Sequence, residues 1–317
     1  MQEDNLTVGT EFFLLGFQGN QQSNIFLFCV LLMVYCGTVC GNLLIITLVS
    51  TSKNLHTPMY FFISQLSICD IMLSTDIVPN MFQILLNDGG AIAFLGCMTQ
   101  FYFFGASEVT ECYLLTVMSY DRYVAICNPL RYSSIMTSAH CVMLAALCWL
   151  VGFSFALIYI LTISMLRFCG PNIIDHFFCD LVPLVEIACS DTYAIELEDR
   201  MTCFVAVFIP IIVIIISYIH IMVTILRFQS KVSRLRALST CSSHLTVVSI
   251  FYITLLSIYL FPKRQTLNLS KVLSLLYTVF TPLINPIIYS LRNKEIKKSL
   301  QQIISKYVAC STNILMY

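Results

Sequence analysis

Seven long apolar stretches, separated by shorter polar connections, dominate the pattern of hydrophobic and polar positions along the chain. A helix needs about 20 apolar residues to cross the hydrocarbon layer of a membrane, and each stretch reaches that length. We therefore predict membrane-spanning helices over Ile25–Ser50, Pro58–Leu86, Phe94–Ala125, Ala139–Ile163, Glu196–Arg227, Ala237–Phe261 and Ser270–Leu291. The predicted fold is an all-α membrane protein, a seven-transmembrane helix bundle over residues 25–291, with tails at 1–24 and 292–317.

Composition supports a membrane protein. Of the 317 residues, 58% are hydrophobic and 11% are charged, and the mean hydropathy is +0.84. A soluble domain carries about 25% charged residues, so a soluble globular domain is excluded. The N-terminal residues are polar and lack the apolar core of a cleavable signal peptide, so the first span is expected to direct insertion itself.

Charge predicts the orientation of the bundle. The connections after spans one, three and five, together with the C-terminal tail, hold twelve basic and two acidic residues, whereas the opposite face holds five basic and eleven acidic residues. Basic connections stay in the cytoplasm, so the N-terminal tail is expected to be extracellular. Asn5, in Asn5-Leu6-Thr7, is then an accessible N-glycosylation site. Asn268 lies in a second match that adjoins the seventh span, and we expect it to stay unmodified.

Four of the fifteen cysteines fall on the predicted extracellular face: Cys97, Cys169, Cys179 and Cys189. An even number of cysteines in an oxidising compartment indicates two disulfides, and the spacing leaves all three connectivities open. Most of the other cysteines lie within spans, where they are expected to act as small apolar residues.

Prolines interrupt two of the predicted spans. Pro282 and Pro286 each remove one backbone hydrogen bond from the seventh helix, so we expect it to bend near Asn285. Pro210 has the same effect in the fifth span. Prolines are common in membrane helices, so the functional use of these bends is a hypothesis and packing alone is the alternative.

The segment after the seventh span is predicted to form an amphipathic helix on the membrane surface. Its apolar positions and its basic positions fall on different faces: Ile296, Leu300, Ile303 and Ile304 on one, and Lys294, Lys297 and Lys298 on the other. Cys310 is either palmitoylated or, as is commoner for a tail cysteine, unmodified. The basic run Arg227–Arg236 is too short for nucleic acid, and we interpret it as an anchor to anionic lipid.

Two acidic residues, Asp70 and Glu111, fall near the middle of the second and third spans, where an ionised group is costly. Asn42 and Asn285 are the polar residues expected to meet Asp70. A second pair of acids, Glu108 and Asp76, lies nearer the outer side. The rarity of acids at this depth marks all four for function or for a buried polar network.

The motifs at the ends of the spans resemble those of rhodopsin-like G-protein-coupled receptors. Asp121-Arg122-Tyr123 closes the third span, and Asn285-Pro286-Ile287-Ile288-Tyr289 closes the seventh. More narrowly, the whole chain resembles vertebrate odorant receptors. The matching segments are LHTPMYFF (55–62), MSYDRYVAIC (118–127), HFFCD (176–180), SY (217–218), RALSTCSSH (236–244) and PLINPIIYSLRN (282–293).

The chain departs from the usual pattern of this family at four positions: Ser119, Arg236, Ile253 and Ile284. Ile253 stands where glycine is common, and we expect it to change how the sixth helix bends. The replacements at Ser119 and Arg236 are mild.

The resemblance implies an activation switch at the cytoplasmic side. Asp121 would hold Arg122 in the resting state, and activation would release this arginine towards tyrosines of the fifth and seventh spans. The residues assigned to the switch are Asp121, Arg122, Tyr123, Tyr218, His244, Asn285, Pro286 and Tyr289. The alternatives are that Arg122 merely reaches the lipid headgroups and that His244 is an ordinary interior histidine rather than a pH-sensitive one.

The resemblance also implies a sodium ion between Asp70 and Glu111, and a protonated acid is the alternative. It implies a disulfide between Cys97 and Cys179, after which Cys169 and Cys189 remain for the second. No other cofactor is expected. Val279 stands where an opsin carries its retinal lysine, so no covalent chromophore is predicted.

Receptors of this fold bind small ligands between the outer halves of spans three, five, six and seven. The residues that the motif offsets place there are Phe101, Phe104, Gly105, Glu108, Val109, Thr202, Cys203, Ala206, Tyr252, Leu255, Tyr259, Leu275 and Thr278. Their mainly apolar character suits a small organic molecule, and we expect several to serve packing only. Glu108, with or without Asp76, is a candidate partner for a cationic amine or, when protonated, a hydrogen-bond donor to a carbonyl group. Phe104 replaces the aspartate of biogenic-amine receptors, so their mode of amine binding is not expected.

The predicted function is that of an odorant receptor in the plasma membrane of olfactory sensory cilia. It would bind odorants and activate a stimulatory, olfactory-type heterotrimeric G protein, which raises cAMP. The alternatives are another chemosensory G-protein-coupled receptor and a membrane transporter or channel. An enzyme is not expected, because the sequence contains neither HExxH nor GxSxG.

Overall fold

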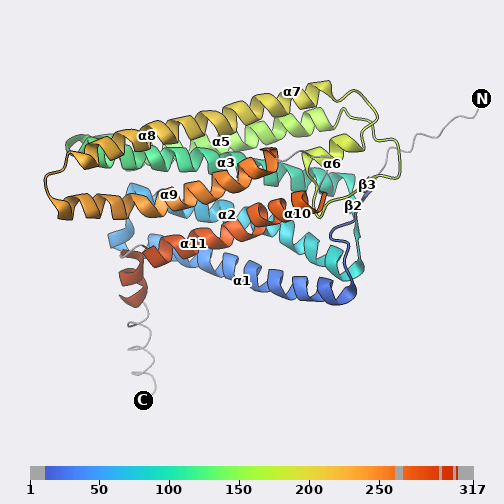
Figure 1. Ribbon diagram of the computed structural model, residues 1–317, viewed down its shortest axis with the longest axis horizontal. Coiled ribbons are helices and arrows are strands. Elements are labelled where there is room, and N and C mark those ends of the chain that lie inside the picture. Colours follow the sequence, from blue (N-terminus) through green and yellow to red (C-terminus); the bar gives the residue numbers. More distant parts are fainter. Residues whose placement is uncertain (1–10, 261–266, 293–294, 303–304, 306–317) are drawn as a thin grey trace, which may run out of the picture.

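The computed structural model describes residues 11–260, 267–292, 295–302 and 305. Within this part of the chain, seven long helical segments lie side by side in one bundle (Figure 1). The segments are α1 (Gln21–Thr51), α2 (Pro58–Asn87), α3 (Phe94–Cys127), α5 (Ser138–Ile163), α7 (Tyr193–Thr202) continued by η3 (Cys203–Phe208) and α8 (Ile209–Leu226), α9 (Lys231–Leu260), and α10 (Leu267–Leu275) continued by η4 (Leu276–Phe280) and α11 (Thr281–Arg292). They agree with the predicted spans to within a few residues, except that α9 begins at Lys231 instead of Ala237.

Six of these segments are long and apolar enough to cross a membrane, as judged over the described residues. The segment outside that group is α3, whose sequence includes Glu108, Glu111 and Asp121. Because α3 contacts α2, α5, α8 and α9, its acidic side chains face other helices rather than lipid. The lipid-facing positions of the surrounding helices carry large apolar side chains, such as Met33 of α1 and Ile219 of α8.

Local sequence signals explain several of the helix ends. Asn20 precedes α1, and its side chain accepts a hydrogen bond of 2.9 Å from the backbone N–H of Ser23. Pro58 is the first residue of α2, where its missing N–H costs nothing. The same helix ends at Asp88, which adopts a left-handed conformation with φ of 51°.

Two short π-helical segments, η3 and η4, interrupt the fifth and seventh membrane-length helices. Each lies just before a proline, Pro210 or Pro282, that cannot donate the backbone hydrogen bond of a regular helix. In η4, the Thr281 hydroxyl donates to the carbonyl of Leu276 at 3.1 Å. The π-helical part of the seventh helix therefore precedes Pro282, and Pro286 lies inside α11.

A three-stranded sheet covers one end of the bundle, which we call the sheet end (Figure 1). It comprises β1 (Glu11–Leu14), β2 (Gly90–Ala93) and β3 (Ile173–Ile174). The central strand β1 pairs antiparallel with β2 and parallel with β3. Phe12 and Leu14 point into the bundle and are 1% exposed, so this part of the polar N-terminal tail is an integral layer of the fold. The sequence did not predict the sheet.

The opposite end carries short connections. It includes η1 (Lys53–Leu55), η2 (Pro129–Arg131), α4 (Tyr132–Ile135) and the turn between α8 and α9. The predicted lipid anchor, Arg227–Arg236, is partly helical, because α9 begins at Lys231. Arg234 donates hydrogen bonds to the carbonyls of Leu226 and Phe228 and so caps α8.

Residues 295–302 are helical, as expected for the amphipathic segment. Ile296 is 1% exposed and packs in the main hydrophobic cluster, and Lys297 and Lys298 are exposed. Lys294, Ile303, Ile304 and Cys310 lie outside the described residues.

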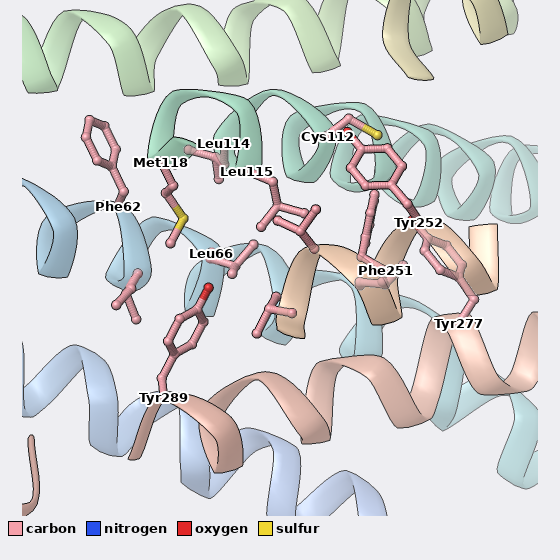
Figure 2. Packing of buried hydrophobic residues seen from close by; sticks show 14 of the residues in the cluster. Phe62, Leu66, Cys112, Leu114, Leu115, Met118, Phe251, Tyr252, Tyr277 and Tyr289 are labelled. Carbon is pink, nitrogen blue, oxygen red and sulfur yellow. The ribbon is translucent and has the colours of Figure 1, made fainter. Parts of the chain in front are cut away.

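The main hydrophobic cluster fills the centre of the bundle and draws on every one of its membrane-length segments. Figure 2 shows part of it, where α2, α3, α9, η4 and α11 contribute Phe62, Leu66, Cys112, Leu114, Leu115, Met118, Phe251, Tyr252, Tyr277 and Tyr289. A second cluster lies at the sheet end, around Phe12, Cys97, Phe101 and Tyr159.

Candidate functional site

A cavity lies near the sheet end between α3, α5 and the segment formed by α7 and η3. Its wall is mainly apolar and aromatic, with acidic residues at Glu108, Asp180 and Asp199. Eight of the predicted ligand-binding residues line it: Phe101, Phe104, Gly105, Glu108, Val109, Thr202, Cys203 and Ala206. We call it the first cavity.

A second cavity lies between α3, α9, α10 and η4. The predicted residues Leu255 and Thr278 line it, together with Phe104 and Glu108. The two cavities share five residues, namely Phe104, Glu108, Asp180, Leu181 and Asp199. They are therefore neighbouring lobes of one region, with volumes of about 70 and 60 Å³.

The π-helical segments form part of both walls. Cys203, Ala206 and Val207 of η3 line the first cavity, and Tyr277 and Thr278 of η4 line the second. Such segments occur frequently at functional sites, because they redirect side chains that a regular helix would place elsewhere.

Two of the predicted ligand-binding residues line neither cavity. Tyr252 packs edge-on against Phe251, with ring centroids 5.0 Å apart, inside the main hydrophobic cluster. Leu275 also packs in that cluster. Its predicted position was counted from the motif at Asn285, and η4 lies between the two, so the α-helical count no longer holds. The side chain of Tyr259 lies outside the described residues.

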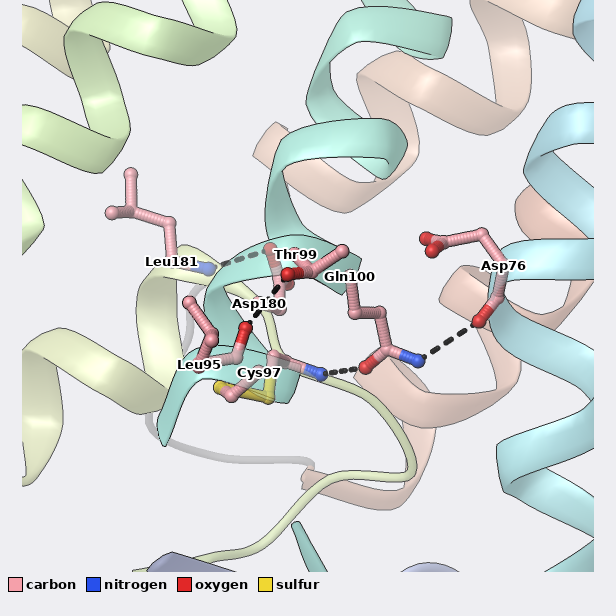
Figure 3. Close-up of a disulfide and its surroundings, with 8 residues drawn as sticks. Asp76, Leu95, Cys97, Thr99, Gln100, Asp180 and Leu181 are labelled. Atoms are coloured by element: carbon pink, nitrogen blue, oxygen red, sulfur yellow. Dashed lines mark hydrogen bonds between the residues drawn. A yellow bond between two sulfur atoms is a disulfide. The ribbon is translucent and has the colours of Figure 1, made fainter. Parts of the chain in front are cut away.

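Two disulfides hold the loop over these cavities. Cys97 at the start of α3 is bonded to Cys179, and Cys169 is bonded to Cys189. These are the pairs that the family resemblance implied. Gln100 reinforces the first, because its side-chain carbonyl accepts from the backbone N–H of Cys179 at 2.9 Å and its amide donates to the backbone carbonyl of Asp76 at 3.1 Å (Figure 3).

A buried lysine ties this loop to the N-terminal segment. Lys271 of α10 is 2% exposed, and its ammonium donates to the backbone carbonyl of Gly16 at 2.7 Å and to Asp175 Oδ1 at 2.5 Å. The neighbouring His176 is 3% exposed and lies against Phe177 and Phe178, with ring centroids 4.6 and 4.7 Å apart. Burial, and then the charge of Lys271, lower the pKa of His176 to about 3.

Asp76 does not share a cavity with Glu108, contrary to the joint role that the sequence suggested. It lines an open groove between α2, β2 and the start of α3. One of its carboxylate oxygens, Oδ2, is buried without a hydrogen bond in the described part of the chain. Glu108 is therefore the acidic residue of this pair that faces the two cavities.

Asp70 and Glu111 meet in the middle of the bundle, where each is 1% exposed. The side-chain amide of Asn285 donates to Asp70 Oδ1 at 3.0 Å and to Glu111 Oε1 at 3.4 Å. Asn42 does not join them, because its amide donates to the backbone carbonyls of Thr38 and Pro282. The prediction of a contact to Asp70 was therefore right for Asn285 and wrong for Asn42.

These two carboxyl groups fit a small monovalent cation or a proton. One amide is too little to offset two buried carboxylates, so a positive charge must neutralise at least one of them. Carboxylate oxygens are suitable ligands for a hard cation. In the described residues, no cluster of three or more histidine, cysteine or acidic side chains is placed to hold a metal ion, so backbone or hydroxyl oxygens would have to complete a sodium site.

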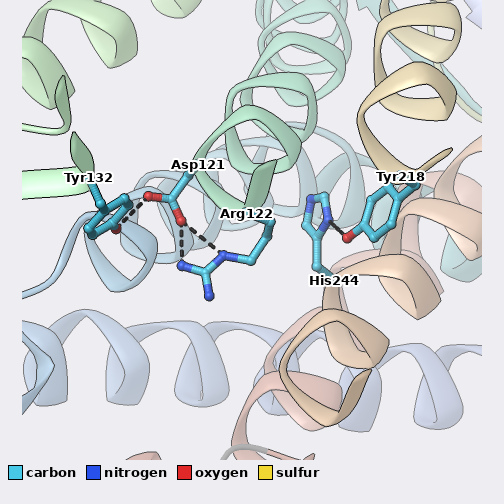
Figure 4. Close-up of polar contacts among 5 residues, drawn as sticks. All are labelled: Asp121, Arg122, Tyr132, Tyr218 and His244. Atoms are coloured by element: carbon cyan, nitrogen blue, oxygen red, sulfur yellow. Dashed lines mark hydrogen bonds and ion pairs between the residues drawn. The ribbon is translucent and has the colours of Figure 1, made fainter. Parts of the chain in front are cut away.

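At the end opposite the sheet, Arg122 is paired with its neighbour in the chain (Figure 4). Its Nε donates to Asp121 Oδ2 at 2.9 Å, and a second guanidinium nitrogen contacts the same oxygen. The hydroxyl of Tyr132 donates to the other carboxylate oxygen at 2.7 Å. Burial, and then the charge of Asp121, raise the pKa of Tyr132 above its usual range, so this hydroxyl keeps its proton.

Other predicted switch residues lie on the helices around Arg122. The ring nitrogen Nδ1 of His244 in α9 lies 2.6 Å from the hydroxyl of Tyr218 in α8. Tyr289 of α11 is 2% exposed, and its hydroxyl makes no hydrogen bond within the described part of the chain. Tyr123 packs against His220, with ring centroids 5.9 Å apart. Pro286 of α11 lies close to Gly41 of α1.

Sequence reasoning missed several residues of these sites. Tyr132 lies in a short helix after the arginine motif, and Gln100 lies one turn from Cys97. In the cavities, Phe178, Asp180, Leu181 and Tyr277 were missed. The position of Phe178 and Asp180 beside Cys179 was the one available signal, because the predicted disulfide brings that loop to the top of α3.

Comparison with known proteins identifies the family. A family model described as "Olfactory receptor" matches residues 28–307. Olfactory receptor 5P60 of Mus musculus is 44% identical over 321 residues, which cover 100% of this chain and 99% of the relative. Olfactory receptor 6N1 of Homo sapiens is 44% identical over 303 residues, which cover 95% and 97% of the two chains.

The fold has a counterpart among solved structures. The crystal structure of squid rhodopsin matches with a TM-score of 0.74 over 93% of this chain and 89% of that chain, at 16% sequence identity. This likeness confirms the predicted seven-helix membrane fold. The chain therefore belongs to the olfactory receptor family, and it is a multi-pass membrane receptor of the G-protein-coupled type rather than an enzyme.

Proposed function

We propose that this protein is an odorant receptor of olfactory sensory cilia that binds small organic odorants in the two cavities and activates a stimulatory, olfactory-type heterotrimeric G protein. The sheet end would face the outside, because the basic connections lie at the other end and the disulfides need an oxidising compartment. Family membership supports this role, and the mainly apolar cavity walls suit the expected ligands.

One observation carries the proposal. A single helix, α3, connects the two regions, because Glu108 lines both cavities and Arg122 lies further along the same helix in its pair with Asp121. The distance along the axis from position 108 to position 122 is about 21 Å at 1.5 Å per residue. A ligand that contacts α3, η3 and α9 near the sheet end is therefore mechanically connected to the arginine.

The response would be a shift between two states. In the state described here, Asp121 pairs with Arg122 and accepts a hydrogen bond from Tyr132, and the contact between Tyr218 and His244 joins α8 to α9. In the active state, α9 would move away from Arg122 and open a surface for the G protein. An odorant can drive this change only by its difference in affinity for the two states, and moving the ratio from about 1:99 to 99:1 needs about 5.5 kcal/mol.

The buried pair of carboxyl groups extends the proposal. We assign Asp70, Glu111 and Asn285 to a sodium-sensitive site that stabilises the resting state. Purified receptor should then melt at a higher temperature in sodium chloride than in choline chloride, and Glu111→Gln should remove the difference. Equal melting temperatures in the two salts would assign the neutralising charge to a proton instead.

The decisive experiment measures odorant-evoked cAMP in cells that express the receptor with a stimulatory G protein. The variant Arg122→Gln removes the charge, and Arg131→Gln is the matched control because Arg131 is exposed in the neighbouring connection. Receptor at the cell surface is quantified for each. We expect the cAMP response to be lost in Arg122→Gln and kept in Arg131→Gln. A full response in Arg122→Gln would refute the switch, and an odorant-driven current in cells without the G protein would indicate a channel.

A further inference from the structure

Glu108 stands at the junction of the two cavities. It lines both of them, and it lies on α3 between the levels of Phe104 and Cys112, which also line one or both. A ligand in either cavity therefore meets its carboxyl group. The other residues common to both cavities are Phe104, Asp180, Leu181 and Asp199.

Glu108 has no protein partner in the described part of the chain. Three almost completely buried acids of the bundle do have one: Asp70 and Glu111 accept from Asn285, and Asp121 accepts from Arg122. Glu108 is partly buried, and an acidic group in such a place is costly unless something compensates its charge. A compensating group from a ligand would relieve that cost.

A second, independent polar group in the same region also lacks a partner. Tyr277 of η4 lines the second cavity and is 1% exposed, and its hydroxyl makes no hydrogen bond within the described residues. Buried tyrosine hydroxyls normally find a partner. The second cavity thus contains a hydroxyl that can accept a hydrogen bond from a ligand, close to the carboxyl group of Glu108.

The carboxylate of Glu108 selects the sign of the ligand's charge. Glu108 lines both cavities, and among the described residues neither lining includes a lysine, arginine or histidine. A carboxylate in such a lining attracts cations and repels other carboxylates. Its aromatic side chains, including Phe101, Phe104 and Tyr277, can contact both a hydrocarbon chain and an ammonium group.

We propose that the odorants of this receptor are small aliphatic amines, bound as ammonium ions. The ammonium donates to the carboxylate of Glu108, the Tyr277 hydroxyl accepts a further N–H bond, and the hydrocarbon part lies against Phe101 and Phe104. An aliphatic amine has a pKa close to that of lysine, about 10.4, and is charged at neutral pH. This inference rests on the proposed function, because it takes the two cavities to be the odorant site.

The test compares two ligands that have the same hydrocarbon chain, one with a charged ammonium group and one with a neutral hydroxyl group. Purified receptor in lipid nanodiscs is titrated with hexylamine and with hexanol at neutral pH, and binding is followed by the rise in melting temperature. Glu108→Gln removes the charge at constant size, Glu108→Asp keeps it, and Glu186→Gln is the control, because Glu186 is exposed on α6 (Leu181–Glu186) and lines neither cavity. Loss of the charge of an ion pair of this kind should weaken hexylamine binding by roughly 30-fold or more.

We expect hexylamine to bind tighter than hexanol to the wild-type protein and to Glu186→Gln, and we expect this preference to vanish in Glu108→Gln. Equal or tighter binding of hexanol by the wild-type protein would overturn the proposal, and this comparison needs no variant. Unchanged hexylamine binding by Glu108→Gln would overturn it as well. Hexylamine binding without cAMP production in cells would contradict the proposed coupling to the G protein but not the ligand class. A cAMP response to neutral odorants without hexylamine binding would contradict the ligand class but not the proposed coupling to the G protein.

Discussion

Gly152 of α5 provides a sharp test of how α3 is held in the bundle. A methyl group added at Gly152 would lie 2.2 Å from the hydroxyl oxygen of Thr110 and 2.6 Å from the backbone carbonyl oxygen of Ala106. The threonine side chain can rotate away. The carbonyl oxygen belongs to the helix itself, so Gly152→Ala forces α3 and α5 apart.

The expected cost follows from two opposing terms. Replacing glycine by alanine inside a helix favours folding by about 1 kcal/mol. Overpacking a well-filled interface costs about 1–3 kcal/mol, and the upper part of that range applies here because the clash involves backbone. We therefore expect Gly152→Ala to lower the stability of the receptor by about 1–2 kcal/mol.

Gly105→Ala is the matched control, because Gly105 lies on the other side of the same interface. Its added methyl group would meet the side chain of Ala156 at 3.9 Å, which is ordinary contact. Only the preference of a helix for alanine over glycine then applies. The variant should be as stable as the wild type or more stable by up to about 1 kcal/mol.

Thermal unfolding of the purified receptor in detergent measures both variants. The fluorescence of Trp149, the single tryptophan of the chain, reports directly on α5. Gly152→Ala should melt below the wild type, and Gly105→Ala should not. If Gly152→Ala melted at or above the wild-type temperature, the close approach of α5 to the backbone of α3 would be refuted.

Three further predictions concern the two ends of the bundle. Tyr132→Phe removes the 2.7 Å hydrogen bond to Asp121, a charge-assisted bond worth about 1.5–3 kcal/mol. The cAMP level without odorant, normalised to the amount of receptor at the cell surface, should rise several-fold. An unchanged level would contradict a role of Tyr132 in restraining the resting state. His176 has its pKa lowered from 6.5 to about 3, so the unfolded state binds a proton that the folded state does not, and stability should fall as the pH drops from about 6.5 towards 3. Melting curves at several pH values should show this slope in the wild type and a weaker one in His176→Phe. Lys271→Met breaks the ion pair with Asp175, whose side chain is 35% exposed and can regain water, so the free energy of unfolding should fall by about 1–3 kcal/mol. Hydrogen exchange should become faster in β1 but not in α3.

The spans were predictable because each follows from local sequence. In a bilayer every backbone hydrogen bond must be satisfied inside the span, so an apolar stretch of sufficient length is already committed to a helix. This is why Pro58–Leu86 was expected and α2 covers Pro58–Asn87. The early start of α9 at Lys231 was missed because that part is basic and lies beyond the apolar stretch.

The sheet shows where local sequence is insufficient. The strand Glu11–Leu14 is short, and it pairs with Gly90–Ala93 and Ile173–Ile174, which are far away in the chain. Nothing within a strand of this length specifies such distant partners. The pairing is possible because the bundle and the disulfide between Cys97 and Cys179 bring the three segments to the same end.

The candidate site divides in the same way. Positions on α3 were predictable, since a regular helix places Phe101, Gly105 and Glu108 on one face. On the seventh helix Thr278 was predicted and does line the second cavity, but η4 changes the number of residues per turn, so the neighbouring positions were not predictable. Tyr277 therefore lines the second cavity, whereas Leu275 packs in the core.

The sequence by itself determined that the chain crosses the membrane as a helix bundle and which end carries its basic charge, because these properties depend on the order of residues along one segment. Only the tertiary structure decided which acidic side chains are paired. Asp121 and Arg122 are neighbours in the chain, but the meeting of Asp70 and Glu111 at Asn285 and the lack of a partner for Glu108 depend on how separate helices pack. The free-energy cost of a buried charge depends on the groups that surround it in space, and the order of residues along the chain does not specify those groups.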